Sequence, residues 1–258
     1  ISIGLQSPNN KELAMLGRIH NYAQFLESFQ MARAAGFSNI NVDLMFAIPG
    51  QCYEGWIENL RMVAALGPEH ISAYSLIIEE GTPFSRKKLD LPDEDTEYRM
   101  YEDVAVVLKE YGYHQYEISN YAKAGRECRH NEGYWQRKDY LGLGLGAASL
   151  LGKERFSNTS DMQEYLKNSS APEKIRKNRE LLTREDEMAE FMFLGLRMTQ
   201  GVSKKEFQEY FGTAIENIYG EVLKKYKKQG LLLEESGRIF LSREGIHVSN
   251  AVMAEFLL

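Results

Sequence analysis

The first half of the chain alternates short apolar runs with amphipathic stretches, and this alternation predicts strands and helices in turn. The predicted strands are Ile1–Leu5, Ile40–Phe46, Ile71–Ile78 and His114–Ile118. The predicted helices are Ala23–Ala35, Tyr53–Leu66 and Glu94–Tyr111, and a glycine follows each of them. Strand–helix units that recur in this way indicate right-handed crossovers and a parallel sheet. The pattern fits either a doubly wound sheet or part of a (β/α) barrel.

The second half of the chain is patterned differently. Glycine occupies every second position of Gly142–Gly146, which lets the backbone approach a neighbour closely or bend tightly. Ser169–Lys177 is polar and predicts a solvated connector. The elements predicted after Thr183 are the helices Glu185–Thr199, Ser203–Tyr210 and Ala214–Gln229, a hairpin within Gly230–Leu241, and a last helix Ser242–Phe256. This order is typical of a winged-helix domain.

We therefore expect three parts. Residues 1–125 carry the strand–helix units, residues 126–182 form a connector with a glycine-rich strand, and residues 183–258 form a winged-helix-like, mainly helical domain. The chain has 258 residues, enough to bury a sizeable core. It begins at Ile1, without a methionine and in the middle of a predicted strand, so we expect a fragment of a longer protein.

Composition narrows the class of protein. Lys and Arg number 31 against 37 Asp and Glu, and this net charge of −6 argues against a nucleic-acid-binding protein. Two cysteines exclude a disulfide scaffold and are too few for a four-thiolate zinc site or a conventional iron–sulfur cluster. No apolar run is long enough to span a membrane and no signal peptide is visible. We expect a cytoplasmic protein with no stable membrane insertion.

Polar side chains near the ends of parallel strands are the first candidates for chemistry, because that edge of the sheet faces the ligand. The candidates are Gln6, Asp43, Tyr74 with Ser75, and Glu117. Asp43 lies between Val42 and Leu44, and it has two interpretations: a carboxylate that orients a loop, or an acceptor for a ligand hydroxyl such as that of a ribose. Gln6 is either a ligand contact or a turn residue.

His130 is the most suggestive of the five histidines, because it follows Cys128 by two residues and precedes Tyr134 and Trp135. It could ligate a metal or a haem iron, or it could be a packed and hydrogen-bonded residue. Cys128-x-His130 is too short a pattern for a zinc site. Arg18 is either a ligand contact or part of a surface ion pair.

Two features could indicate nucleic acid or phosphate. The basic run Lys224–Lys228 suits DNA, but compensation of the helix dipole explains it more simply in an acidic chain. The glycine-alternating segment lacks the Lys-Ser/Thr of a phosphate-binding loop.

An ordered set of motifs is more specific than any one of them. The motifs are Ser2-Ile3-Gly4-Leu5-Gln6-Ser7, Leu16-Gly17-Arg18-Ile19-His20, Asn41-Val42-Asp43-Leu44-Met45, Ile48-Pro49-Gly50-Gln51, His70-Ile71-Ser72-Ala73-Tyr74-Ser75-Leu76, Gln115-Tyr116-Glu117-Ile118-Ser119-Asn120-Tyr121-Ala122, Cys128-Arg129-His130-Asn131-x-x-Tyr134-Trp135 and Tyr140-Leu141-Gly142-Leu143-Gly144. Together they resemble the oxygen-independent coproporphyrinogen III oxidase-like radical SAM family over essentially the whole chain. The His-Asn-x-x-Tyr-Trp element resembles the haem-chaperone (HemW-type) branch more than the true oxidase.

The resemblance implies a fold and a set of ligands. The fold would be part of a radical SAM (β/α) barrel followed by a winged-helix-like domain, with S-adenosylmethionine lying across the carboxyl ends of the strands. Gln6, Arg18 and Asp43 match the family's S-adenosylmethionine contacts, with Asp43 on the ribose, and Ile77 matches a contact near the nucleoside. His130 matches the histidine of the motif associated with haem binding. No residue of this chain is predicted to be catalytic or to ligate a metal.

The chain also departs from the family pattern. The Cys-x3-Cys-x-x-Cys loop that holds the [4Fe-4S] cluster is expected upstream of Ile1, so this chain alone should be inactive. Ala47 stands where glycine is usual, Ala148 where histidine often follows the glycine-rich segment, and Pro8 where phenylalanine is common.

The resemblance predicts the intact protein to be a haem chaperone that passes haem to an accepting protein. The alternatives are a coproporphyrinogen III dehydrogenase of porphyrin biosynthesis, acting on the porphyrinogen, and a winged-helix nucleic-acid-binding module. We also expect the first strand to be an exposed edge that pairs with a second copy in a homodimer.

Overall fold

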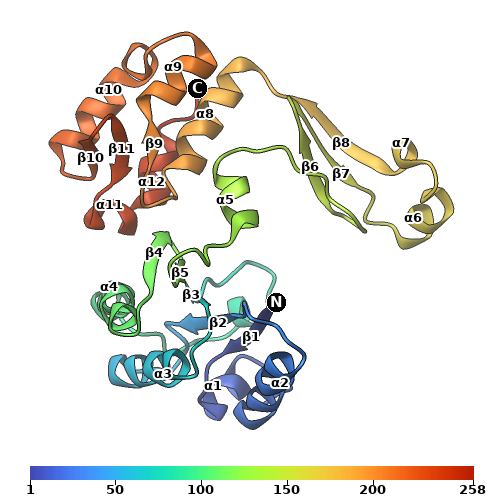
Figure 1. Cartoon of the computed structure of the whole chain (residues 1–258), viewed down its shortest axis with the longest axis vertical. Coiled ribbons are helices and arrows are strands. Elements are labelled where there is room, and N and C mark those ends of the chain that lie inside the picture. Colours follow the sequence, from blue (N-terminus) through green and yellow to red (C-terminus); the bar gives the residue numbers. More distant parts are fainter. The chain divides into compact units, whose positions relative to one another are not determined.

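The computed structural model describes residues 1–258, which form two compact units, Ile1–Glu127 and Cys128–Leu258. We call them the N-terminal and the C-terminal unit (Figure 1). No helix in either unit combines the length and the apolar character that a membrane crossing requires.

The N-terminal unit is built on one open five-stranded sheet with the order β1-β2-β3-β5-β4. Its strands are β1 (Ser2–Gln6), β2 (Asn41–Phe46), β3 (His70–Ser75), β4 (His114–Glu117) and β5 (Asn120–Ala122). The first three pair in parallel, as predicted. The prediction of a fully parallel sheet was wrong at the far end of the sheet, because β5 turns back and pairs antiparallel with both β3 and β4.

Helices cover one face of this sheet and supply the core (Figure 1). They are α1 (Asn10–Met15), α2 (Tyr22–Ala34), α3 (Tyr53–Ala65) and α4 (Glu94–Glu110), with a 3-10 turn at Phe84–Arg86. Asn21 begins α2 with a reciprocal capping box to Gln24, and Asp93 begins α4 by accepting from the backbone N–H of Thr96. Apolar side chains at helical spacing then face the sheet. The indole N–H of Trp56, which is fully buried, donates to the Met100 carbonyl and ties α3 to α4.

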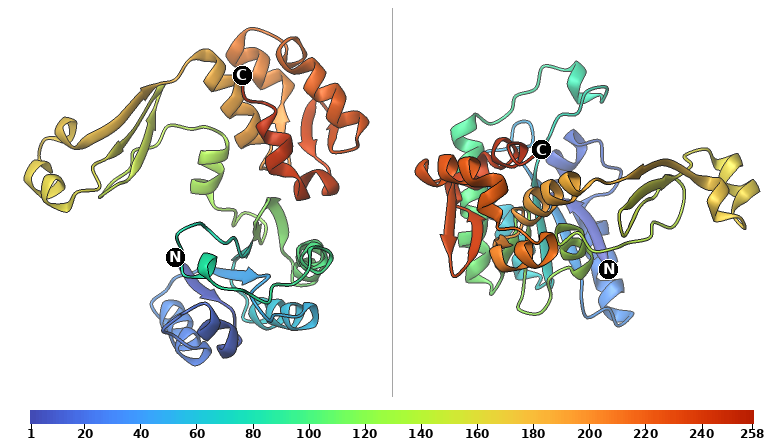
Figure 2. Two further views of the ribbon diagram at one scale, coloured as in Figure 1. Left: turned by 180° about the vertical axis from the view of Figure 1, so that it is seen from behind. Right: turned by 90° about the horizontal axis from the view of Figure 1, so that it is seen from above.

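The C-terminal unit begins with α5 (Arg129–Trp135) and an antiparallel sheet of β6 (Ala148–Leu151), β7 (Glu154–Asn158) and β8 (Arg176–Leu181). Helices α6 (Met162–Asn168) and α7 (Pro172–Ile175) lie at one end of this three-stranded ribbon (Figure 2). Most residues of Ser169–Lys177 are exposed, as expected of a solvated connector, but the segment is not a plain loop, since it includes α7 and the start of β8.

The glycine-rich segment does not form the expected strand but makes a tight bend. Gly144 and Gly146 adopt positive φ angles of 110° and 68°. A Cβ at Gly142 would lie 2.1 Å from the carbonyl oxygen of Ala148, so only glycine fits there. The close approach that the glycine pattern predicted is present.

The rest of the C-terminal unit packs helices against a second three-stranded antiparallel sheet with the order β10-β11-β9. The elements are α8 (Arg184–Gly195), β9 (Val202–Ser203), α9 (Lys204–Phe211), α10 (Ile215–Lys228), β10 (Leu232–Glu235), β11 (Arg238–Leu241), α11 (Arg243–His247) and α12 (Ser249–Ala254). Buried rings of Phe207, Tyr219 and Phe256 lie at its centre. The single last helix predicted from Ser242 is interrupted at Val248, whose φ and ψ of −109° and 22° are not helical.

Candidate functional site

One face of the N-terminal sheet is polar, and it is the face that the core helices do not cover. Strand register places Ser2, Asn41 and His70 in one row across β1, β2 and β3, and Asp43 beside Ser72 in the next row. Since side chains alternate between the two faces of a strand, these residues point away from the core residues Val42, Leu44 and Ile71. Such a face is unusual for parallel strands, which are commonly apolar on both sides.

A chain of hydrogen bonds crosses this face and ends at a carboxylate. Nδ2 of Asn41 donates to Oδ1 of Asp43 at 2.7 Å and to the Ser2 hydroxyl at 2.8 Å. Oδ1 of Asn41 lies 2.6 Å from Nδ1 of His70, and Nε2 of His70 lies 2.7 Å from the Tyr116 hydroxyl. The Ser2 hydroxyl donates to Oδ2 of Asp43 at 3.1 Å.

The direction of this chain follows from chemistry. The carboxylate of Asp43 can only accept, so Asn41 turns its NH₂ toward Asp43 and its oxygen toward His70. Nδ1 of His70 then carries the proton and donates, and the Tyr116 O–H donates to Nε2. Burial lowers the pKa of His70 to about 4, against the opposing effect of the Asp43 and Glu127 carboxylates, so the ring is neutral at neutral pH.

The predicted ligand residues of this unit lie at different places in the fold. Asp43 is the third residue of β2, so it lies on the sheet face and not at the carboxyl edge where we expected it. Gln6 ends β1 in a left-handed conformation with φ of 72°, and Arg18 is exposed in the turn after α1. Ile77 is 73% exposed in the segment after β3, which ends at Ser75 rather than at Ile78.

Polar groups of β1 lie beside Asp43. Gly4 is its registered neighbour on β1 and has no side chain, and a Cβ there would lie 3.0 Å from Nε2 of Gln6. Asp43 is only partly buried. The exposed backbone at Gly4, the Gln6 amide and the Asp43 carboxylate therefore form one polar surface, which we call the polar cradle.

The other candidate of this sheet edge, Glu117, has a structural role. Its Oε1 accepts from the backbone N–H of Ser119 at 2.8 Å and from Nδ2 of Asn120 at 2.6 Å, and this fixes the turn between β4 and β5. Glu117 is 1% exposed, whereas Tyr74, near the end of β3, is 40% exposed and can be reached from solvent.

His130 lies on α5 in the C-terminal unit and is exposed. Its ring packs edge-on against Tyr134 with 4.6 Å between centroids, and Tyr134 packs in the same way against Tyr140 at 4.6 Å. No hydrogen bond within the chain occupies its ring nitrogens. The ring is thus packed, as one of the two interpretations expected, but its nitrogens accept and donate no hydrogen bond within the chain; binding of a metal or haem iron stays a prediction.

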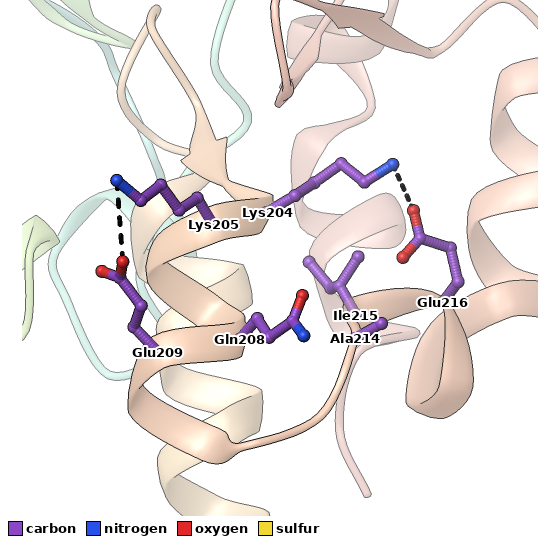
Figure 3. Close-up of a pocket in the computed structure, with 7 residues that line it drawn as sticks. All are labelled: Lys204, Lys205, Gln208, Glu209, Ala214, Ile215 and Glu216. Carbon is purple, nitrogen blue, oxygen red and sulfur yellow. Dashed lines mark ion pairs between the residues drawn. The ribbon is translucent and has the colours of Figure 1, made fainter.

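Two cavities lie in the C-terminal unit. The larger, of about 910 Å³, is bordered by Trp135, Arg137, Met198, Tyr210 and Arg238 among others. The smaller, of about 380 Å³, lies between α9 and α10, and its two lysines pair with Glu209 and Glu216 (Figure 3). Neither cavity contains a predicted ligand residue. No group of three or more His, Cys, Asp or Glu side chains comes together in a way that could hold a metal ion.

Sequence reasoning missed Asn41, His70 and Tyr116, although Asn41 and His70 had a signal. Asn41 and Asp43 alternate with Val42 and Leu44, and His70 and Ser72 alternate with Ile71 and Ala73. This period of two marks a strand with one polar face. Tyr116 had no comparable signal, because its contact with His70 depends on how β5 is inserted.

Comparisons with known proteins agree with this architecture. A family model described as the HemN C-terminal domain matches residues 182–248. The haem chaperone HemW of Bacillus subtilis (strain 168) is 37% identical over 261 residues, which cover 100% of this chain and 69% of the chaperone. HemW of Escherichia coli (strain K12) is 33% identical over 94% of this chain and 66% of its own length. The solved structure of the radical SAM enzyme coproporphyrinogen III oxidase, HemN, from Escherichia coli matches with a TM-score of 0.82 at 19% identity, over 99% of this chain and 63% of that enzyme.

Proposed function

The chain belongs to the radical SAM family of HemW and HemN, and from this we propose that the intact protein is a haem chaperone that binds S-adenosylmethionine on the polar sheet face and haem at His130. The observation that carries the proposal is the polar cradle at Gly4, Gln6 and Asp43, in a chain that is 37% identical to haem chaperones. HemN shares the fold, and at 19% identity that likeness bears on the fold alone.

The cradle fits the nucleoside part of S-adenosylmethionine. The Asp43 carboxylate accepts hydrogen bonds from ribose hydroxyls, and the Gln6 amide offers both a donor and an acceptor. Arg18 and Ile77 complete the predicted contacts from the segments after α1 and β3. Both are exposed, as residues that meet a ligand from the solvent side would be.

The exposed imidazole of His130 fits haem. A neutral imidazole nitrogen is an axial ligand of haem iron, and the rings of Tyr134 and Tyr140 next to it offer an apolar surface to the porphyrin. A [4Fe-4S] cluster does not fit the residues of this chain, since such a cluster takes more thiolates than Cys52 and Cys128 provide. We derive no step through a cluster.

The C-terminal unit and the partners follow from the same proposal. The order of α8, β9, α9, α10 and the β10–β11 hairpin supports a winged-helix domain over residues 183–258. The net charge of −6 argues against nucleic acid as its macromolecular partner, and the proposed role in its place is that of a donor to a haem-accepting protein. β1 is an edge strand of this chain and supports pairing with a second copy, and we place the protein in the cytoplasm.

Haem titration of the intact protein tests the proposal. We expect a Soret band that saturates with haem, and we expect His130→Ala to weaken haem binding at least tenfold. His114→Ala is the matched control, because His114 is an exposed histidine whose Nε2 lies 2.9 Å from the Glu127 carboxylate, and the variant should leave the band unchanged. Conversion of coproporphyrinogen III by the reconstituted intact protein would show a dehydrogenase instead of a chaperone. Equal haem binding by the His130→Ala variant would remove His130 as the ligand.

A further inference from the structure

Asn41 uses every hydrogen-bonding position of its amide. Its oxygen accepts from His70 at 2.6 Å and from the Ser72 hydroxyl at 3.2 Å, and its NH₂ donates to Asp43 at 2.7 Å and to Ser2 at 2.8 Å. A side-chain amide has two donors and two lone pairs, so none is left for a ligand. The role of Asn41 is therefore directed at its neighbours.

We propose that Asn41 is a positioning residue that holds the Asp43 carboxylate in the orientation that receives the vicinal ribose hydroxyls of S-adenosylmethionine. The inference rests on the proposed function, because it takes Asp43 as the ribose contact. It adds the reason why that carboxylate points in one direction before the ligand arrives.

The neighbours of the Asn41 amide fix its orientation. His70 is 4% exposed and Tyr116 is 6% exposed, so both rings are held by packing. A flipped amide would set its oxygen against the Asp43 carboxylate, and this contact is repulsive whichever tautomer His70 adopts. Only one orientation of Asn41 satisfies both neighbours.

The orientation of Asp43 is fixed in turn. Asn41 occupies one lone pair of Oδ1, and the Ser2 hydroxyl occupies one of Oδ2 at 3.1 Å. Each carboxylate oxygen has room for about two hydrogen bonds, so one position remains on each oxygen. Two free acceptor positions on one carboxylate match the two adjacent hydroxyls of a ribose. Gly4, in register with Asp43, adds no side chain there, and the amide of Gln6 lies over its backbone within reach of the same ligand.

Binding of two ligands to the intact protein tests this role. The probes are S-adenosylmethionine and its 2′,3′-dideoxyribose analogue, measured by calorimetry. We expect the wild-type protein to bind S-adenosylmethionine at least tenfold more tightly than the analogue. Asn41→Ala should weaken the binding of S-adenosylmethionine roughly tenfold, which corresponds to the loss of about one charge-assisted hydrogen bond. The affinity of Asn41→Ala for the analogue should stay within about twofold of the wild-type value, because the analogue has no ribose hydroxyls that depend on the orientation of the Asp43 carboxylate.

Two further variants keep the outcome decisive. Asn41→Asp keeps the shape of the side chain but removes the donor to Asp43, and it should also lose the preference for the ribose diol. Asn39→Ala, an exposed asparagine just before β2, is the control and should bind as wild type does.

Asp43→Ala distinguishes a failure of the proposed ribose contact from a failure of the positioning role of Asn41. If Asp43→Ala keeps the preference for the diol, the proposed ribose contact itself is wrong. If Asp43→Ala loses the preference while Asn41→Ala and Asn41→Asp keep it, the ribose contact stands and the positioning role of Asn41 is overturned.

Discussion

The carboxylate of Glu12 accepts a hydrogen bond of 2.9 Å from the side-chain amide of Gln51, which joins the segment after β1 to the segment after β2. The same oxygen accepts from the Ser7 hydroxyl at 2.5 Å and from Nδ2 of Asn59 on α3 at 3.0 Å. All four residues are buried. This contact set holds the loops at the carboxyl edge of the sheet, next to the polar cradle.

Replacement of Glu12 should destabilise the N-terminal unit. Glu12→Ala leaves three buried donors without their acceptor, and we expect the free energy of unfolding to fall by about 3 kcal/mol. Urea unfolding followed by circular dichroism measures the change. Glu58→Ala, at an exposed position of α3, is the control and should change stability by less than about 0.5 kcal/mol. Equal midpoints for the two variants would contradict the role of Glu12.

His70 should make the stability of the protein depend on pH. Its folded pKa of about 4 lies below the unfolded value of 6.5, so the unfolded state binds more protons between these two pH values. The stabilisation is therefore complete above pH 6.5 and is lost as the pH falls toward 4. A shift of this size corresponds to roughly 3 kcal/mol.

The difference between wild type and His70→Gln isolates this contribution. Unfolding free energies measured from pH 7 down to pH 4 should converge for the two proteins as the pH falls, because only wild type carries the titrating ring. Parallel pH profiles would show that His70 is not the group responsible.

Local patterns predicted most of the N-terminal unit. The three parallel strands and the three long helices agree with their apolar spacing and their glycine stops. The antiparallel strand β5 has only three residues, Asn120–Ala122, and its place between β3 and β4 depends on tertiary pairing that no local pattern contains. β8 was missed because five of its six residues are exposed and its polar sequence resembles a loop.

The candidate site could be predicted only in part for a related reason. Asp43 is conspicuous between Val42 and Leu44, and the sequence alone identifies it. Its partners are set by register: Asn41 faces His70 because β2 and β3 pair Asn41 with His70, and a shift by one residue would turn Asn41 to the core. The network is thus a property of the sheet and not of a motif.

A buried ion cluster in the C-terminal unit predicts a second stability effect. Glu190 is 4% exposed and accepts from Arg137 at 2.7 Å and from Arg155 on β7 at 2.5 Å, so it links α8 to the β6–β8 sheet. Without Glu190, Arg137 keeps its pair with Glu187 and Arg155 is 39% exposed to water, so Glu190→Ala should cost about 2 kcal/mol, the loss of hydrogen bonds between charged groups. Thermal unfolding checks this. Glu209→Ala breaks an exposed pair with Lys205 of 3.7 Å and should cost less than about 0.5 kcal/mol.

Gly142 should tolerate no side chain, and this tests the tight bend before β6. A Cβ at Gly142 would lie 2.1 Å from the carbonyl oxygen of Ala148, and backbone atoms cannot move aside as a flexible side chain would. Gly142→Ala therefore has to displace the bend, and we expect a loss of about 2 kcal/mol or more in the free energy of unfolding. Gly220→Ala is the control, because a Cβ at Gly220, just after the kink at Tyr219 in α10, meets nothing within 4 Å and the exchange should not destabilise the protein by more than about 0.5 kcal/mol. Thermal unfolding should show a clear loss for Gly142→Ala and little change for Gly220→Ala. An unfolding temperature of Gly142→Ala equal to or above that of wild type would show that the bend is not closed against Ala148.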